Sequence, residues 1–448
     1  FMHTIVQERR KFGPLGFNVP YEFSQADLSA CVNYIQNHLN DMETKKRSVD
    51  WITVNYMVCD VQYGGKITDD WDRRLFNTYG KSWLTEKCLS PEFQFRPGHD
   101  TYKIPVAADI EVYRKYISEE IPLVDDPELF GMHANADLVF RTSQTKNVLN
   151  TVLDIQPKEG GGGGGLTREE IVLKMVEDLQ VKCPPDYNPD NVKSSIKALG
   201  GLGKPLNICL KQEIDRLQKV IKVLKTSLAN LKLAIAGTIV MSPELAEALD
   251  ALFLARVPPA WTKVSDLQAP SMGVWFANIL NRAEQLTTWL KNGRPLCFWL
   301  TGFFNASGFL TANRQECCRA HVKDGWALDD CVSTYEVMKQ ERDDVKHGPS
   351  EGIYIYGLFL DGCKWDKGKQ SLVDSDPKVL FAQLPVLLIA ATASADKSGK
   401  AKDVTYECPV YRAPKRTGLN FITSVKLKSD DGSMKWVLRG VCLLTTTD

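Results

Sequence analysis

The stretch FWLTGFFNASGFLTANRQECCRAH, residues 298–321, gathers side chains that could do chemistry. Cys317 and His321 are one helical turn apart, so an imidazole could activate a thiol nucleophile. With Cys318 and Cys331, the same residues could instead offer ligands to zinc. Adjacent cysteines point about 100° apart on a helix, and no second ligand pair follows at structural zinc spacing. Three interpretations stay open on these residues alone: an active site, a metal site, or an aromatic surface with incidental polar residues.

Nucleotide chemistry requires a phosphate loop, G-x-x-x-x-G-K-[ST], and the chain has no full match. The nearest approach is GKS at 80–82, where Leu75 occupies the position of the required first glycine inside an amphipathic helical pattern. GLGKP at Gly201 has Pro205 in place of the hydroxyl residue. The six glycines at 160–165 end in Leu-Thr, so we interpret them as a flexible joint.

Other charged residues have simpler interpretations. The carboxylate pairs at 69–70 and 343–344 lie in charged turns, where solvation explains them. Arg73 and Arg74 follow in a helical pattern, and an arginine in a nucleotide-driven machine can contact a phosphate. Since the chain lacks a phosphate loop, we favour an ion pair at a module interface for these two arginines.

The composition describes a protein that folds around a substantial core. Its 448 residues are 44% hydrophobic, and 55 basic residues balance 55 acidic ones. Zero net charge disfavours nucleic acid and anionic membranes as partners. Twelve cysteines without a C-x-x-C pair indicate reduced thiols in an intracellular protein. The longest apolar run, LPVLLIAATASA from Leu384, is too short to span a bilayer. Because the sequence begins with Phe1, we expect a piece of a larger protein.

Local signals predict several helices. Ser24 with Asp27, and Thr167 with Glu170, are helix-start pairs. A long helix is predicted where apolar residues recur at alternating steps of four and three, namely at Leu210, Ile214, Leu217, Ile221, Leu224, Leu228, Leu231 and Ile235. Its other faces carry lysines that solvation explains, although docking onto an acidic neighbour stays open: Lys219, Lys222, Lys225 and Lys232.

After Gly348 the pattern changes to short β-rich runs, which predict a small antiparallel barrel or sandwich. The expected fold class is therefore α+β. Three domains are expected: a helical lid over 1–150, a helical domain with the long helix over 151–348, and a β-rich cap over 349–448.

Five motifs, in sequence order, resemble the C-terminal region of dynein heavy chains. They are VQERRKFGPLGFNVPYEFSQADL, VQYGGKITDDWDRRLFNTY, FGMHANADL, LKQEIDRLQKVIKVLKTSLANLKLAIAGTIVMS and FWLTGFFNASGFLTANRQECCRAH. SEGIYIYGLFLDGCKWD, KVLFAQLPVL and YECPVYRAPKR are most similar to axonemal, outer-arm heavy chains. The sequence departs from the family pattern at Ala306, where proline is usual, and at Cys317-Cys318, where a non-cysteine pair is common. These departures weaken the interpretation of a special thiol.

The resemblance implies a lid of the sixth AAA+ module, which is not a nucleotide site, followed by a dynein C-terminal domain with a barrel-like cap. It implies a non-catalytic part of an ATP-driven, minus-end-directed microtubule motor of the cytoplasm and cytoskeleton, in the axoneme of a cilium or flagellum. ATP and Mg²⁺ would bind other modules, a stalk outside this chain would bind the microtubule, and no cofactor is expected here. The implied partners are the other AAA+ modules and the linker of the same heavy chain, dynein intermediate and light chains, and other heavy chains.

By the same resemblance, the long helix and the GFFNASGFLTA segment would brace several modules of the ring. We therefore interpret residues 298–321 as a docking wedge whose large apolar side chains insert into a neighbour. The candidate interface residues are Arg73, Arg74, Phe298, Trp299, Phe303, Phe304, Phe309, Arg314 and Arg319, with Leu310 beside them. Two alternatives remain: an interaction scaffold that forms an intermolecular coiled coil, and a cysteine-dependent enzyme.

Overall fold

The computed structural model describes residues 2–98, 101–105, 107, 109–124, 126–155, 167–393 and 404–447. The six-glycine run, predicted to be a flexible joint, lies outside these residues. The chain forms two compact units, each built from segments that are distant in sequence. The first unit comprises Phe1–Ile155, Phe359–Leu384 and Lys402–Thr447, and the second comprises Gln156–Leu358 and Pro385–Ala401.

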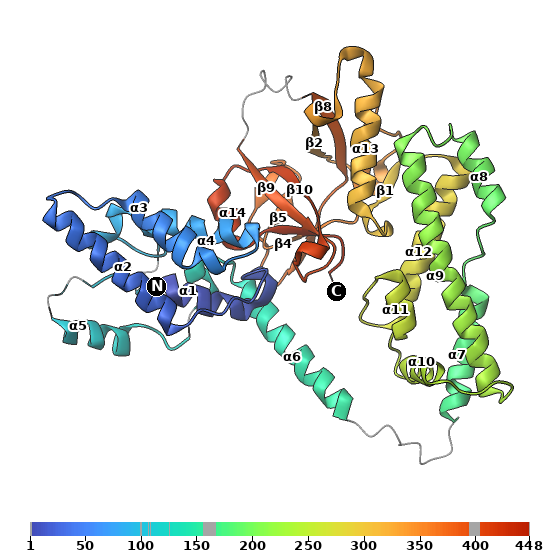
Figure 1. Ribbon diagram of the computed structural model, residues 1–448, viewed down its shortest axis with the longest axis horizontal. Coiled ribbons are helices and arrows are strands. Elements are labelled where there is room, and N and C mark those ends of the chain that lie inside the picture. Colours follow the sequence, from blue (N-terminus) through green and yellow to red (C-terminus); the bar gives the residue numbers. More distant parts are fainter. Residues whose placement is uncertain are drawn as a thin grey trace. The chain divides into compact units, whose positions relative to one another are not determined.

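Helices make up most of the first unit (Figure 1). Their bounds are α1 Met2–Arg9, α2 Gln25–Thr44, α3 Trp51–Asn55, α4 Asp70–Trp83, α5 Ile110–Lys115, α6 Asn135–Ile155 and α14 Ser433–Arg439. The predicted start of α2 is confirmed, because the Ser24 amide donates to the Asp27 carboxylate at 2.7 Å. Helix α4 starts with the roles reversed, because the carboxylate of its N-cap residue, Asp69, accepts from the amides of Trp71 and Asp72.

A five-stranded sheet completes the first unit, in the order β10-β9-β11-β4-β7. Its strands are β4 Phe359–Asp361, β7 Phe381–Gln383, β9 Thr405–Tyr411, β10 Phe421–Lys428 and β11 Cys442–Leu444. The short strand β11 pairs parallel with β9 and antiparallel with β4, so it joins two parts of the chain. A separate two-stranded sheet pairs β5 Lys364–Asp366 with β6 Ser371–Val373.

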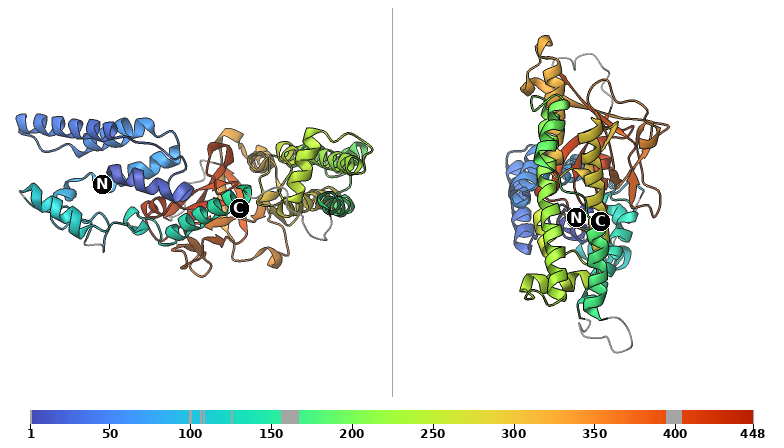
Figure 2. Two further views of the ribbon diagram at one scale, coloured as in Figure 1. Left: turned by 90° about the horizontal axis from the view of Figure 1, so that it is seen from below. Right: turned by 90° about the vertical axis from the view of Figure 1, so that its right-hand side faces the viewer.

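The long helix α9, Pro205–Ile235, is the element around which the other helices of the second unit pack. Figure 2 shows it as a long green helix with its helical neighbours alongside. Its predicted periodicity is confirmed: the heptad positions from Leu210 to Leu231 are at most 1% exposed. They pack inside the unit, because α9 contacts six other helices. These are α7 Arg168–Lys182, α8 Pro189–Ala198, α10 Pro243–Phe253, α11 Pro259–Ser265, α12 Met272–Asn292 and α13 Ala306–Ala320. The seam is therefore already filled within this chain, which removes the basis for an intermolecular coiled coil.

The second unit has a four-stranded sheet of its own, in the order β1-β3-β8-β2. Its strands are β1 Cys297–Trp299, β2 Cys331–Val337, β3 Ile353–Tyr356 and β8 Leu387–Ala393. Strand β8 pairs antiparallel with β2 and β3, and β1 pairs parallel with β3.

The α+β class is confirmed, but the expected barrel is not. Both larger sheets are open and contain parallel as well as antiparallel pairs in the described part of the chain. The strands predicted as one cap over 349–448 are divided between the units, since β8 pairs with β2 while β9 and β11 pair in the other sheet. Short strands with similar alternation of apolar and polar residues do not specify which strand they pair with. The sequence therefore could not show that these strands belong to two sheets.

Candidate functional site

The glycine-lysine-serine segment at 80–82 lies inside helix α4. Gly80 allows close packing there: a Cβ atom on it would lie 2.3 Å from the Cys59 sulfur. The Ser82 hydroxyl donates to the carbonyl of Thr78 one turn earlier, at 2.9 Å. In this structure the segment is therefore a helix-packing element and not a phosphate loop.

Arg74 connects α4 to strand β9. Its guanidinium donates to the Glu407 carbonyl at 2.9 Å and to the Tyr406 hydroxyl at 3.1 Å, and lies 4.3 Å from the Trp71 ring centroid. Arg73, beside it, donates to the Ile67 carbonyl at 2.8 Å and is otherwise exposed. Arg74 thus does lie where the predicted lid meets the C-terminal strands, but it bonds a carbonyl and a hydroxyl where an ion pair was expected.

Arg9, at the end of α1, is fully buried and makes a larger set of the same contacts. It donates to the carbonyls of Gly16, Phe130 and Leu438 at 2.7, 2.7 and 2.8 Å, and to the Tyr79 hydroxyl at 2.7 Å. Burial lowers the pKa of Arg9 from its ordinary value. A planar fork of donors is suited to this task, because a buried charge is tolerable only when its donors are satisfied.

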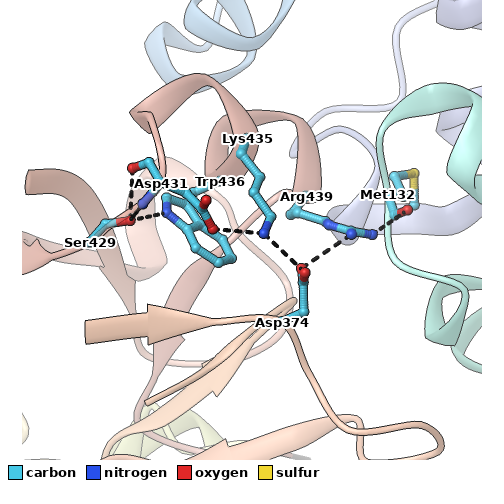
Figure 3. Close-up of polar contacts among 7 residues, drawn as sticks. All are labelled: Met132, Asp374, Ser429, Asp431, Lys435, Trp436 and Arg439. Carbon is cyan, nitrogen blue, oxygen red and sulfur yellow. Dashed lines mark hydrogen bonds and ion pairs between the residues drawn. The ribbon is translucent and has the colours of Figure 1, made fainter. Parts of the chain in front are cut away.

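Arg439, on α14, makes the reciprocal connection from the other end of the chain (Figure 3). It donates to the Met132 carbonyl at 2.8 Å and lies 3.1 Å from Asp374, between strands β6 and β7. Lys435, one turn earlier, also contacts Asp374 at 2.9 Å. Figure 3 shows both cations converging on this carboxylate. Asp374 therefore ties α14 to the β6–β7 connection.

Arg416 provides the last connection of this kind. It pairs with Asp361 of β4 at 2.6 Å and donates to the Gly440 carbonyl at 2.7 Å. Burial raises the pKa of Asp361, while the Arg416 charge opposes that effect. Gly440 has φ +67°, and a Cβ atom there would lie 2.3 Å from the Leu15 carbonyl, so only glycine fits this approach.

We call Arg9, Arg74, Arg416 and Arg439 the arginine joint. Each donates to backbone carbonyls, and together they hold residues from both ends of the chain in one unit. Only Arg74 was singled out from the sequence. The sequence does contain a signal for Arg439, because it lies in the apolar run WVLRGV. A cation in such a run is expected to be buried and to need hydrogen-bond partners.

The predicted docking wedge is a buried cluster in the second unit. Phe298, Phe303, Phe304 and Phe309 are at most 2% exposed, and Phe303 stacks on Phe309 with ring centroids 3.9 Å apart. Trp289 of α12 packs against Phe298 at 4.9 Å. The docking interpretation is thus corrected for these four rings, because they fill their own core and leave no aromatic surface to insert elsewhere.

A buried charge orders the turn within this cluster. Glu213 of α9 is 2% exposed, and its carboxylate accepts from the amides of Phe304 at 2.6 Å and Asn305 at 2.9 Å, where α13 begins. Burial raises the pKa of Glu213 above its ordinary value. Arg282 of α12 lies 4.7 Å from the Phe304 ring and donates to the Thr301 carbonyl. These two residues were missed from the sequence, since Glu213 looks like one more surface residue of a heptad helix.

The remaining candidate interface residues are dispersed. Trp299 is half-buried, with Arg282 at 5.9 Å from its ring. Arg314 is half-buried on α13, and Arg319 is exposed and donates to the Gly203 carbonyl at 2.7 Å. Contact of these three with another module stays a prediction.

Of the four α9 lysines singled out from the sequence, two have acidic partners within the chain. Lys225 lies 2.7 Å from Asp186, and Lys232 lies 2.8 Å from Glu177. Docking onto an acidic neighbour is therefore unnecessary to explain this pair.

The cysteine and histidine trio does not form a catalytic or zinc arrangement. Cys318 is joined to Cys331 by a disulfide, which corrects the expectation that all cysteines are reduced. His321 lies 2.8 Å from Asp324 and 3.0 Å from Glu351, so both ring nitrogens face carboxylates, and the bond to Asp324 raises the pKa of His321. Burial raises the pKa of Cys317, which opposes formation of the thiolate that a nucleophile needs.

Within the described ranges, no three His, Cys, Asp or Glu side chains are grouped in a way that could hold a metal ion. The helices of that part of the protein are all too short or too polar to cross a bilayer.

Taken together, the fold and the arginine joint define a region in which a helical lid shares one compact unit with a C-terminal sheet, while the long helix and a second sheet form another unit. Residues 1–136 match the family model for the AAA lid domain of dynein heavy chains, and residues 142–445 match the family model for their C-terminal domain. The protein belongs to the dynein heavy chain family.

Several relatives are axonemal. The chain is 50% identical over 445 residues to human dynein axonemal heavy chain 8 and 48% identical over 444 residues to mouse dynein axonemal heavy chain 5, covering 99% of this chain in both cases. It is 45% identical over 458 residues to the gamma chain of the flagellar outer arm dynein of Chlamydomonas reinhardtii. The chain spans 9 to 10% of the length of these curated relatives.

Proposed function

We propose that this chain is the structural and regulatory C-terminal region of an axonemal dynein heavy chain and has no catalytic role of its own. The parent protein would be a microtubule-stimulated ATPase of the outer dynein arm, located in the axoneme of a cilium or flagellum. The relatives named for axonemal and outer-arm dyneins support this assignment. ATP and Mg²⁺ would bind modules outside this chain.

The arginine joint is the observation that carries the proposed role. Residues matched by the lid model and residues matched by the C-terminal domain model fold into one unit, with Arg9 and Arg439 bonding carbonyls across the two parts. A joint of buried, hydrogen-bonded charges is stiff, because each bond lost leaves a buried polar group unsatisfied. A lid held in this way would transmit a movement of its AAA+ module to the C-terminal sheet, and the sheet would restrain the lid.

The partners proposed for the chain are the other AAA+ modules and the linker of the same heavy chain. Dynein intermediate and light chains and other heavy chains are proposed as partners of the parent complex. Trp299, Arg314 and Arg319 stay the candidate residues for contacts with ring modules.

The regulatory role can be tested with Arg439→Ala in the parent heavy chain. The change removes one carbonyl bond and one ion pair of the joint and should cost about 1–3 kcal/mol locally. We expect altered microtubule gliding velocity and stall force, with ATP hydrolysis in the absence of microtubules retained. Arg141→Ala is the matched control, since Arg141 is exposed on α6 and pairs with Asp137 one turn away on the same helix. Unchanged gliding and stall force would contradict the proposal.

The non-catalytic part of the proposal has a direct test. Residues 1–448 expressed alone should fold and show neither ATP turnover nor tight ATP binding. Measurable turnover by that fragment would show that it is catalytic.

A further inference from the structure

The second unit contains a cysteine pair that takes no part in the arginine joint. Cys318 lies near the end of α13 and Cys331 is the first residue of β2, and a disulfide joins them with their Cα atoms 6.6 Å apart. That separation is within the usual range for disulfides. We propose that Cys318 and Cys331 are a reversible redox modification site, at which a disulfide forms and is reduced again to two thiols.

The state of the other cysteines supports reversibility. Ten are free thiols, and three of these, Cys88, Cys183 and Cys297, are partly exposed to solvent. In compartments that keep most cysteines reduced, disulfides are usually transient or redox-sensing.

The position of the pair determines what its oxidation changes. In the described sheet β2 is an edge strand, paired with β8 alone. Helix α13 packs against β8, β2 and α9. The disulfide adds a covalent link between this helix and the free edge of the sheet and closes the connection over 319–330. Reduction would leave the start of β2 held to α13 by noncovalent contacts alone, without removing any strand pairing.

Noncovalent contacts hold the same connection, so reduction should loosen it without unfolding the unit. His321 contacts Asp324 and Glu351, and its ring stacks on Trp326 with centroids 4.3 Å apart. Cys317, although adjacent to Cys318 in sequence, accepts from backbone amides at Gly352 and Ala391. Cys317 therefore faces β3 and β8 and does not compete for the bond with Cys331.

Glutathione disulfide is a sufficient oxidant. The thiolate of one cysteine attacks it, forms a mixed disulfide and releases one glutathione thiolate. The thiolate of the second cysteine then attacks the mixed disulfide on the protein sulfur and releases the second glutathione. The two cysteines lose two protons and two electrons, and one glutathione disulfide becomes two glutathione thiols. Because both sulfurs belong to residues at most 4% exposed, either direction requires local opening of the 319–330 connection.

The modification can be measured on the parent heavy chain. Samples are equilibrated with glutathione disulfide or with reduced glutathione, free thiols are trapped with N-ethylmaleimide under denaturing conditions, and peptides are mapped by mass spectrometry. We expect a Cys318–Cys331 crosslinked peptide in the first sample and alkylation of both residues in the second. Cys317 should be alkylated in both samples. Alkylation of both partners in both samples, or a crosslink that reduced glutathione never opens in the native protein, would overturn the proposal.

Limited proteolysis tests the structural consequence. Cleavage within 319–330 should be on the order of tenfold faster after reduction, because proteolysis follows the population of locally open forms. Cys331→Ser should show the fast rate in both redox states. Cys297→Ser, on the opposite edge strand of the same sheet, is the control and should keep the wild-type difference. Equal cleavage of oxidised and reduced wild-type protein would also refute the site as a structural latch.

Discussion

At the scale of one residue, the buried carboxylate of Asp72 makes the stability of the first unit depend on pH. Asp72 of α4 is 3% exposed and accepts from the amides of Asn18 at 2.9 Å and Val19 at 3.0 Å. Burial raises the pKa of Asp72 from 3.8 to about 6. The folded chain therefore holds this proton up to about pH 6, whereas the unfolded chain loses it near pH 4.

Unfolding between these pH values releases a proton, so the contribution of Asp72 to the free energy of unfolding falls as pH rises from about 4 to about 6. The change should be on the order of 3 kcal/mol, because each pH unit between the two pKa values is worth about 1.4 kcal/mol. We expect urea unfolding of Asp72→Asn to lack this slope between pH 4 and 6. Asp70→Asn, an exposed neighbour on the same helix, should keep it. A mutant with the wild-type slope would mean that another group titrates there.

At the scale of elements, the start of α13 depends on α9. Glu213→Ala would remove the acceptor of two buried amides, those of Phe304 and Asn305, and leave Arg282 without the nearby negative charge. We expect a loss of roughly 2–4 kcal/mol in the stability of the second unit. Hydrogen exchange should show faster exchange of amides 303–309. Glu213→Gln keeps one oxygen and should lose less, and Asp215→Asn, on the exposed face of α9, should change little. Unchanged exchange in Glu213→Ala would exclude this carboxylate as the cap.

Local sequence signals predicted the helices of this protein better than they predicted which strands pair with one another. The helix starts at Ser24 and Thr167, and the heptads of α9, depend on residues three or four positions apart, which a sequence displays directly. Strand partners depend on contacts far along the chain, so the five strands of the first sheet could not be separated from β8 by pattern. The arginine joint was missed for a similar reason: Arg9 bonds carbonyls, and a carbonyl carries no sequence signature. The aromatic cluster was recognised as important, but its composition fits a core as well as an interface.

At the scale of the whole molecule, the ends of the chain fold together. The central strand β11 lies within the last residues, between β9 and β4. Helix α14 brings Leu438 to Arg9 and Arg439 to Met132. A truncation before Gly348 would remove strands from both units, so its effect on motility would combine damage to the first unit with damage to the second. A shorter deletion, confined to the first unit in the described chain, distinguishes the two effects.

Deletion of residues 433–448 removes α14 and β11, and with them the Leu438 carbonyl that Arg9 needs and both cations that bind Asp374. Since Arg9 would stay buried with a donor unsatisfied, we expect helices α1 and α4 to lose protection from hydrogen exchange although the deleted residues are more than 300 positions away. Helix α9 should keep its protection, because the second unit contains no residue of 433–447. If α1 and α4 stayed protected, the lid would be independent of the C-terminal strands and could not be restrained through the arginine joint.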